Sequence, residues 1–78
     1  MPRKRKTVPC WRFYLNYGQG WEHEITEFTV AEMRVNRKAY RENAPQYPLR
    51  ITLGRERVTT SLAHELNLNP AQYDIAAD

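Results

Sequence analysis

Four cationic side chains recur at helical spacing within residues 29–43. They stand at positions i, i+3, i+4 and i+7: Arg34, Arg37, Lys38 and Arg41. At about 100° per residue, this spacing gathers them into one stripe on a helix. Guanidinium groups form bidentate hydrogen bonds with phosphates or carboxylates, so an acidic partner is the natural complement. Only Glu42 is near enough to neutralise this cationic stripe within the helix. The stripe is therefore the leading candidate for partner binding. The alternative is a solvated helix face.

A second candidate surface lies around Tyr14. Large apolar residues alternate there with other residues, which predicts a half-buried strand over residues 10–17. Its core face would carry Trp11, Phe13, Leu15 and Tyr17. The other face would carry Arg12 and Tyr14, together with Arg50 of a later strand. There the Tyr14 ring would be flanked by two cations, as in sheets that stack nucleic-acid bases. The expected register also puts Glu22 and Glu24 there. Those acids would repel phosphate, so an ordinary polar surface is favoured.

Histidine and cysteine, the other residue types that could carry chemistry, are isolated in the sequence. His23 and His64 have no neighbours at metal-ligand spacing, and Cys10 has no base beside it. His23 falls on the core face of a predicted strand, where a packed, hydrogen-bonded histidine is expected. A single cysteine excludes an intramolecular disulfide and supplies too few ligands for a cysteine-based metal site. The sequence therefore predicts no catalytic residue, metal or cofactor, hence no enzyme, and a reducing cytoplasm as the location.

Charge is divided unevenly along the 78 residues. The net charge is +3, but all 12 lysines and arginines lie in residues 1–57, which carry +6, whereas residues 58–78 carry −3. A basic body attracts polyanions, which allows nucleic acid as a partner and argues against an acidic mimic of DNA. No apolar run approaches the roughly 20 residues of a membrane span, so no membrane partner is expected. Residues 1–8 are interpreted as a disordered basic tail, with a nucleic-acid arm or a localisation signal as the alternatives.

A hairpin is predicted around Gly18 and Gly20. These glycines flank Gln19 and can adopt the positive φ of a tight three-residue loop, so residues 21–28 become the return strand. A symmetric closure would pair large apolar groups on the core face: Trp21 with Tyr17, His23 with Leu15, and Ile25 with Phe13.

The helix that carries the stripe has a well-defined start. Thr29 and Glu32 form a T-x-x-E capping box, which predicts that the helix begins at Val30. Pro45 and Pro48 end it. The side chains expected to pack on the sheet, opposite the stripe, are Met33, Val35, Ala39 and Tyr40.

A third strand is predicted from the alternation of Leu49, Ile51 and Leu53, with a bulge or bend at Gly54. The predicted fold is therefore α+β, with β-β-α-β order and a three-stranded antiparallel sheet in the order 2-1-3. One helix packs on one face, and a short helical C-terminal tail follows. The predicted organisation is a tail over 1–8, a domain over 9–60 and a short helical acidic tail over 61–78 packed on the domain.

The C-terminal segment is similar to a helix-turn-helix. Ser61 could cap a helix over residues 62–66, and Asn69 and Pro70 could begin a second turn that runs to Ala76. The second helix would have no cation and would carry acids, which contradicts DNA reading. A capping tail is favoured, packed through Leu62, Leu66 and Leu68.

Two sequence blocks resemble a pattern found in very small accessory proteins of phages and mobile elements. They are N-Y-G-Q-G-W-E at residues 16–22 and Y-R-E-N-A-P-Q-Y-P at residues 40–48. The resemblance covers roughly residues 12–52, and in type it extends to anti-CRISPR proteins, compact domains that bind a CRISPR effector complex and block target binding or cleavage. It implies no particular site residues.

Two functions are therefore expected from the sequence. The first is a non-enzymatic, anti-CRISPR-like inhibitor that binds a host CRISPR effector nucleoprotein complex and sterically blocks target nucleic acid. The second is a sequence-tolerant nucleic-acid-binding accessory protein. The candidate partner-binding residues are Arg34, Arg37, Lys38, Arg41, Arg12, Tyr14 and Arg50. A monomer or weak dimer in the cytoplasm of a bacterial host is expected.

Overall fold

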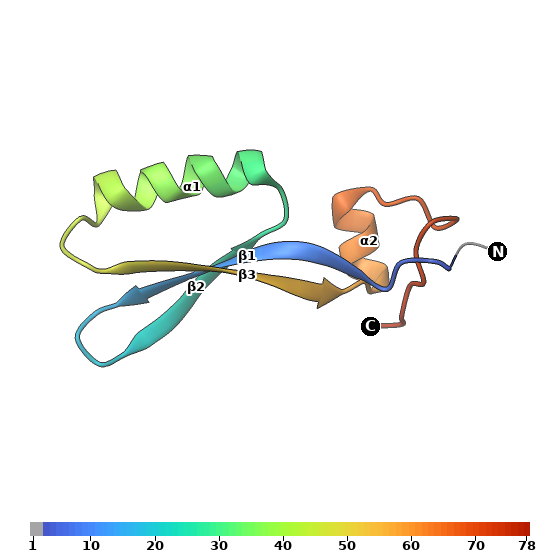
Figure 1. Ribbon diagram of the computed structural model, residues 1–78, viewed down its shortest axis with the longest axis horizontal. Helices are drawn as coiled ribbons and strands as arrows, with labels where there is room; N and C mark the ends of the chain where they lie inside the picture. Colours follow the sequence, from blue (N-terminus) through green and yellow to red (C-terminus); the bar gives the residue numbers. More distant parts are fainter. Residues whose placement is uncertain (1–2) are drawn as a thin grey trace. The chain divides into compact units, whose positions relative to one another are not determined.

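The computed structural model describes residues 3–78 (Figure 1). Its elements are β1 (Thr7–Asn16), β2 (Trp21–Glu27), α1 (Val30–Asn43), β3 (Leu49–Arg57) and α2 (Thr60–Leu66). The strands form one open antiparallel sheet in the order β2-β1-β3. The predicted α+β fold and strand order are therefore confirmed.

The chain divides into two compact units. One contains residues 10–54, and the other contains residues 3–9 together with residues 55–78. The expected domain boundary at residue 60 thus falls inside the second unit. Both candidate surfaces belong to residues 10–54.

Local signals fix both ends of α1. Thr29 has an extended backbone, and its hydroxyl accepts the Glu32 N–H at 3.1 Å, so the helix begins at Val30 as predicted. At the other end, the Ala44 N–H donates to the Tyr40 carbonyl at 2.9 Å, and Pro45 follows. The proline cannot continue the helical hydrogen bonding.

The face of α1 that meets the sheet differs in part from the prediction. Tyr40 lies against the fully buried Phe13, with ring centroids 5.7 Å apart, and the Asn36 side-chain amide donates to Glu27 at 2.8 Å. Val35, however, is 68% exposed, so its assignment to the packing face was wrong. Five residues from Tyr40, it lies about 140° around the helix and points away from the sheet.

A β-bulge in β2 changes the predicted hairpin register. Phe13 pairs with Ile25 as predicted, but Tyr14 pairs with His23, which leaves Glu24 as the extra residue. Beyond the bulge, Leu15 pairs with Glu22 and Asn16 with Trp21. The predicted pairs His23–Leu15 and Trp21–Tyr17 were therefore wrong, because the additional residue moves every side chain of β2 between the turn and the bulge to the opposite face.

The turn of the hairpin is one residue longer than predicted and is organised by Asn16. Its side-chain oxygen accepts the N–H groups of Gly18 at 2.8 Å and Gly20 at 3.4 Å. Both glycines have positive φ, 112° and 107°, which residues with a Cβ rarely adopt. Tyr17 therefore leaves the strand and joins the loop.

Gly54 is part of a continuous β3 and does not mark the predicted bend. A Cβ at this position would lie 2.1 Å from Nη1 of Arg12. Glycine leaves room for the Arg12 guanidinium to cross the strand at this point, and a larger residue would displace this guanidinium. Nearby Leu53, whose alternation with polar residues predicted the strand, is 71% exposed.

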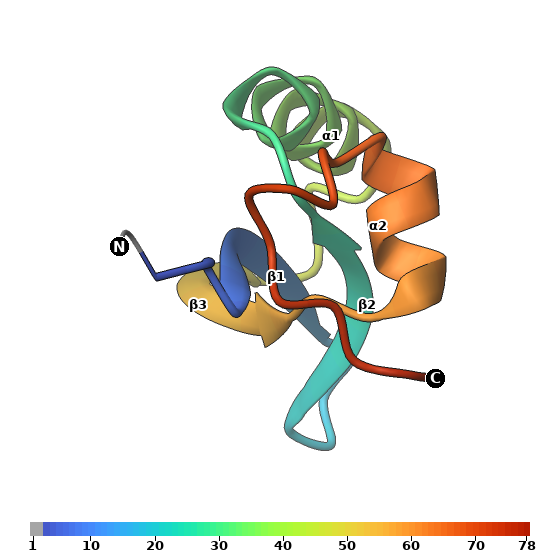
Figure 2. The ribbon, with the colours of Figure 1, turned by 90° about the vertical axis from the view of Figure 1, so that its right-hand side faces the viewer.

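In the second unit, the basic N-terminal segment is paired with the C-terminal segment (Figure 2). The Arg5 N–H donates to the Gln72 carbonyl at 3.0 Å, and the Asp74 N–H donates back to the Arg5 carbonyl at 2.8 Å. The sequence predicts disorder over residues 1–8. Residues 1 and 2 lie outside the described residues, but in the rest of this segment the structure pairs Arg5 and begins β1 at Thr7. The reason is that residues 72–74 supply backbone partners, which local sequence reasoning did not anticipate.

The C-terminal segment forms one helix, not two. Thr59, rather than Ser61, caps α2 by accepting the Leu62 N–H at 3.3 Å, and Asn67 ends the helix in the left-handed conformation. As predicted, Asn69 begins a turn, in which its side-chain oxygen accepts the Ala71 N–H at 3.0 Å and its carbonyl accepts the Gln72 N–H at 2.9 Å, but this turn does not continue to Ala76. Instead, the Ala76 N–H donates to the Val58 carbonyl at 2.9 Å in an extended segment. The helix-turn-helix resemblance therefore has no second helix.

Candidate binding surfaces

The bulge at Glu24 places the acidic side chains of β2 on one face of the sheet. Glu22 pairs with Leu15, and Glu24 accepts a hydrogen bond from Tyr17, so both acids lie on the face that α1 covers. Glu27 bonds to Asn36 of α1 and belongs to the same side. Within residues 10–54, the opposite face of the sheet therefore carries no acidic side chain, contrary to the predicted register.

Cationic and aromatic residues share this opposite face with uncharged polar residues such as Asn16 and Thr26. We define the open face as Arg12, Tyr14, Trp21, His23 and Arg50. The structure brings the predicted Arg12, Tyr14 and Arg50 together there and adds Trp21 and His23, which the sequence-based register had assigned to the core. A bulge signal at Glu24 would have been needed to find them from the sequence, and none is evident.

Ring contacts hold the open face together. Tyr14 and His23 meet edge to face with centroids 5.5 Å apart, and Nε2 of His23 lies 2.9 Å from the Thr26 hydroxyl. The Asn16 N–H donates to the Pro48 carbonyl at 3.1 Å. This hydrogen bond pairs Asn16 of β1 with Pro48, just before β3. Because the two strands are antiparallel, the residues two positions further along, Tyr14 and Arg50, also lie opposite each other.

The Arg50 guanidinium lies over the Trp21 ring, with Cζ 4.9 Å from the ring centroid. This cation–π contact orients both groups without neutralising the charge. Trp21 remains 42% exposed, and His23 and Arg50 are also exposed. The face therefore offers accessible aromatic surface and positive charge side by side.

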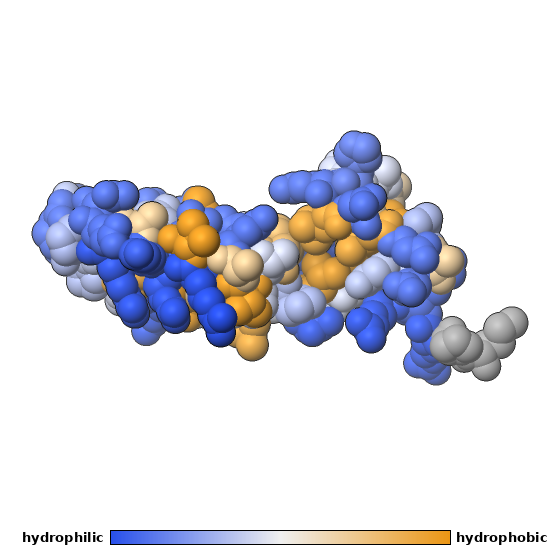
Figure 3. Space-filling view, turned by 90° about the horizontal axis from the view of Figure 1, so that it is seen from above, coloured by the Kyte–Doolittle hydropathy of each residue, from blue (hydrophilic) through white to orange (hydrophobic). Residues whose placement is uncertain are grey.

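The cationic stripe lies on α1 and is accessible to solvent. Arg34, Lys38 and Arg41 are exposed and Arg37 is half-buried. Lys38 and Glu42 form an i,i+4 ion pair at 3.9 Å, with both side chains mostly exposed. Such a pair contributes only about 0.3–0.5 kcal/mol and leaves the stripe available. Figure 3 looks onto this side and shows its mainly hydrophilic surface.

The two candidate surfaces do not form a single site. The open face lies on the side of the sheet away from α1, whereas the stripe is carried by α1 itself. A single flat ligand could not contact all seven candidate residues at once. The residues therefore separate into a helix surface and a sheet surface, which are distinct candidate sites.

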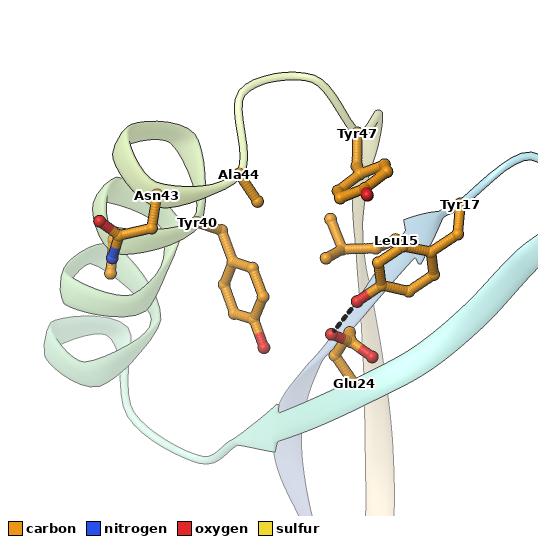
Figure 4. A pocket seen from close by; sticks show the side chains of 8 residues that line it. Leu15, Tyr17, Glu24, Tyr40, Asn43, Ala44 and Tyr47 are labelled. Atoms are coloured by element: carbon orange, nitrogen blue, oxygen red, sulfur yellow. Dashed lines mark hydrogen bonds between the residues drawn. The ribbon is translucent and has the colours of Figure 1, made fainter.

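A third feature, missed by the sequence reasoning, is a cavity between α1 and the hairpin (Figure 4). Its volume is about 220 Å³, and three tyrosine rings and one carboxylate line it: Tyr17, Tyr40, Tyr47 and Glu24. The rings of Tyr17 and Tyr47 meet edge to face, with their centroids 4.6 Å apart. No spacing rule joins residues from β2, α1 and two loops, so only the fold gathers them.

Inside this cavity, the Tyr17 hydroxyl donates to Oε1 of Glu24 at 2.7 Å. This hydrogen bond, with desolvation and the carboxylate charge as smaller causes, raises the pKa of Tyr17 from 10.0 to about 12. Burial raises the pKa of Tyr40, and the charges of Glu24 and Glu27 add to the effect. Both phenols are thus kept neutral beside negative charge.

We expect Glu24→Gln to lower the pKa of Tyr17 toward 10, because the amide removes the charge that opposes phenolate formation. The measurement is a near-ultraviolet absorbance titration, with the matching Tyr17→Phe protein subtracted to isolate this phenol. Since the folded-state pKa exceeds 10.0, the contribution of Tyr17 to stability is lost as pH rises from 10 to about 12. Glu22→Gln is the matched control, and an unchanged titration in Glu24→Gln would contradict the assignment.

Within residues 3–78, histidine, cysteine and acidic side chains form no group of three or more that could hold a metal ion. No helix in the same range is long and apolar enough to cross a membrane.

The chain matches no family model, no curated protein and no solved structure. The geometry of the two surfaces and the cavity is therefore the basis for any functional assignment.

Proposed function

We propose that the protein is a non-enzymatic, sequence-tolerant binder of single-stranded nucleic acid that uses the open face. The observation that carries this proposal is the bulge at Glu24. It adds Trp21 and His23 to Tyr14 and Arg50, and it keeps Glu22 and Glu24 away from them.

The open face combines the two interactions that single strands require. Unpaired bases stack on aromatic side chains, each for roughly 1–3 kcal/mol, and arginines contact the backbone phosphates. Trp21 and His23 on β2 are exposed, and Arg50 on β3 provides charge on the other side of Tyr14. A duplex keeps its bases stacked internally and cannot use the aromatic groups, so single strands should be preferred.

A binding titration at several salt concentrations tests the proposal. The probes are labelled single-stranded DNA and RNA of mixed sequence, compared with the corresponding duplex. Single strands should bind more tightly than the duplex, and log K should fall with log salt by about 0.7 per phosphate neutralised. Absence of binding to single strands at low salt would refute the proposal.

The basic N-terminal segment needs its own control in that titration. Deleting it would also remove the backbone hydrogen bonds of Arg5 with Gln72 and Asp74, so substitution is preferable. Arg3→Ser with Lys4→Ser removes charge while keeping the backbone. Loss of binding in this double substitution would assign it to the N-terminal segment, whereas binding that survives and is weakened by Arg50→Glu belongs to the open face.

The cationic stripe favours a second candidate function, an anti-CRISPR-like inhibitor in the cytoplasm of a bacterial host. In this function the stripe contacts acidic side chains or phosphates of a CRISPR effector nucleoprotein complex and sterically blocks its target. The supporting observation is the exposure of Arg34 and Arg41 on the surface of α1. Charge complementarity of this kind governs partner choice and association rate.

Charge reversal of the stripe tests this second candidate. A folded variant with all four cations replaced by Glu should no longer inhibit an effector complex that the native protein inhibits, because like charges would then face each other. Arg50→Glu on the open face is the matched control. Unchanged inhibition by the folded four-residue variant would remove the stripe from this mechanism.

A further inference from the structure

The cavity between α1 and the hairpin is separate from both basic surfaces and has the opposite electrostatic character. We propose that it binds a quaternary ammonium group, of the kind carried by choline or by trimethylated lysine. The site consists of the rings of Tyr17, Tyr40 and Tyr47 and the carboxylate of Glu24, and it does not depend on the nucleic-acid function proposed above.

The arrangement of the rings supports this assignment. Figure 4 shows the Tyr40 ring on the helix side of the cavity and the Tyr17 and Tyr47 rings on the other side, with Leu15 between them. An aromatic ring attracts a cation placed over its face, and several rings around one space make the known recognition geometry for quaternary ammonium groups. The three rings therefore provide walls for a cation.

Local structure holds these rings in place. The Tyr47 N–H donates to the Ala44 carbonyl at 3.2 Å, which fixes the loop after α1, and Tyr47 in turn contacts Tyr17. The Tyr40 ring packs against the ring of Phe13 in the sheet. Because these contacts already order the tyrosine side chains, ligand binding in the cavity costs little conformational entropy.

Electrostatics select a cation over a neutral group. Glu24 lies within the cavity, and Glu22 and Glu27 are on the same face of the sheet. All three carboxylates oppose ionisation of the neighbouring tyrosines, which is evidence of negative potential where the ligand would sit. An anion would be repelled from this position.

The lining favours an alkylated ammonium over a primary one. A buried primary ammonium needs several hydrogen-bond acceptors, but here one Glu24 oxygen already accepts from Tyr17, and much of the remaining wall is ring carbon with Leu15 and Ala44. A quaternary ammonium has no N–H to satisfy. The volume of about 220 Å³ is below the usual 300–1,000 Å³ of drug-sized sites, so it suits one headgroup.

Calorimetry or NMR titration of the full chain with choline tests the proposal, with 3,3-dimethylbutan-1-ol as the neutral molecule of the same shape. Choline should bind at least roughly tenfold more tightly than the alcohol, with shifts confined to the cavity. Equal binding of the two would overturn the proposal, and so would absence of binding by both choline and a trimethyl-lysine peptide. The peptide, compared with its unmethylated form, decides whether the group comes from a protein or from a small molecule.

Variants separate the cation site from a merely apolar hollow. Glu24→Gln should weaken choline binding roughly tenfold, whereas Glu22→Gln, on the same strand and face but outside the cavity, should change it less than about twofold. Tyr17→Phe keeps the ring and should retain binding. Nucleic-acid binding should be unchanged in Glu24→Gln. Choline binding that survives this substitution in a folded protein would refute the assigned role of the carboxylate.

Discussion

Replacing Trp21 with alanine is expected to weaken binding of single-stranded nucleic acid roughly 5- to 150-fold, the equivalent of one base-stacking contact of about 1–3 kcal/mol. Trp21 is 42% exposed and lies under the guanidinium of Arg50, so its removal takes away both stacking surface and the contact that orients this cation. Fluorescence anisotropy with a labelled oligonucleotide at fixed low salt measures the change.

Tyr17→Ala is the matched control for this substitution. Tyr17 is 44% exposed, close to the value for Trp21, and comes from the same hairpin, but its ring lies on the face that α1 covers. Its replacement should leave nucleic-acid affinity within about twofold of the native protein. If Trp21→Ala and Tyr17→Ala weaken binding equally, the open face is not the binding surface.

The second large effect concerns stability. Phe13→Ala should lower the free energy of unfolding by about 3–5 kcal/mol, because Phe13 is fully buried and its ring packs against Tyr40 of α1. Native domains are stable by only about 5–15 kcal/mol, so this loss removes a large fraction of the total. Urea denaturation followed by circular dichroism gives the difference.

Val35→Ala provides the comparison within the same part of the fold. The sequence pattern assigns Val35 to the packing face of the helix, but the side chain is 68% exposed. Its replacement should change the free energy of unfolding by no more than about 0.5 kcal/mol. A loss comparable to that of Phe13→Ala would mean that α1 is rotated on the sheet relative to the structure described here.

Signals contained in a few neighbouring residues were sufficient to predict the elements and their order. Thr29 defines the start of α1 because its hydroxyl bonds to an N–H only three residues away. Gly18 and Gly20 define the turn because the φ angles of a tight hairpin are local properties. The position of the cationic stripe on one side of α1 follows from helical periodicity alone.

Features that depend on contacts between distant segments could not be predicted in this way. Val35 obeys the helical pattern, but the sheet determines which side of α1 is covered. Arg5 was assigned to a disordered tail, yet it is paired because Gln72 and Asp74 supply distant backbone partners. Gly54 accommodates the side chain of Arg12, a contact that no local rule indicates.

Local sequence patterns were enough to identify the cations and aromatic residues that this protein presents, along with the helix and strands that carry them. Which of these residues share a face depends on strand pairing between segments that are distant in the sequence. The bulge at Glu24 moves His23 and Trp21 to the open face and keeps Glu22 beside Leu15. The physical reason is that side chains alternate with a period of two along a strand, so one extra residue, fixed by the pairing with β1, reverses the face of every residue beyond it.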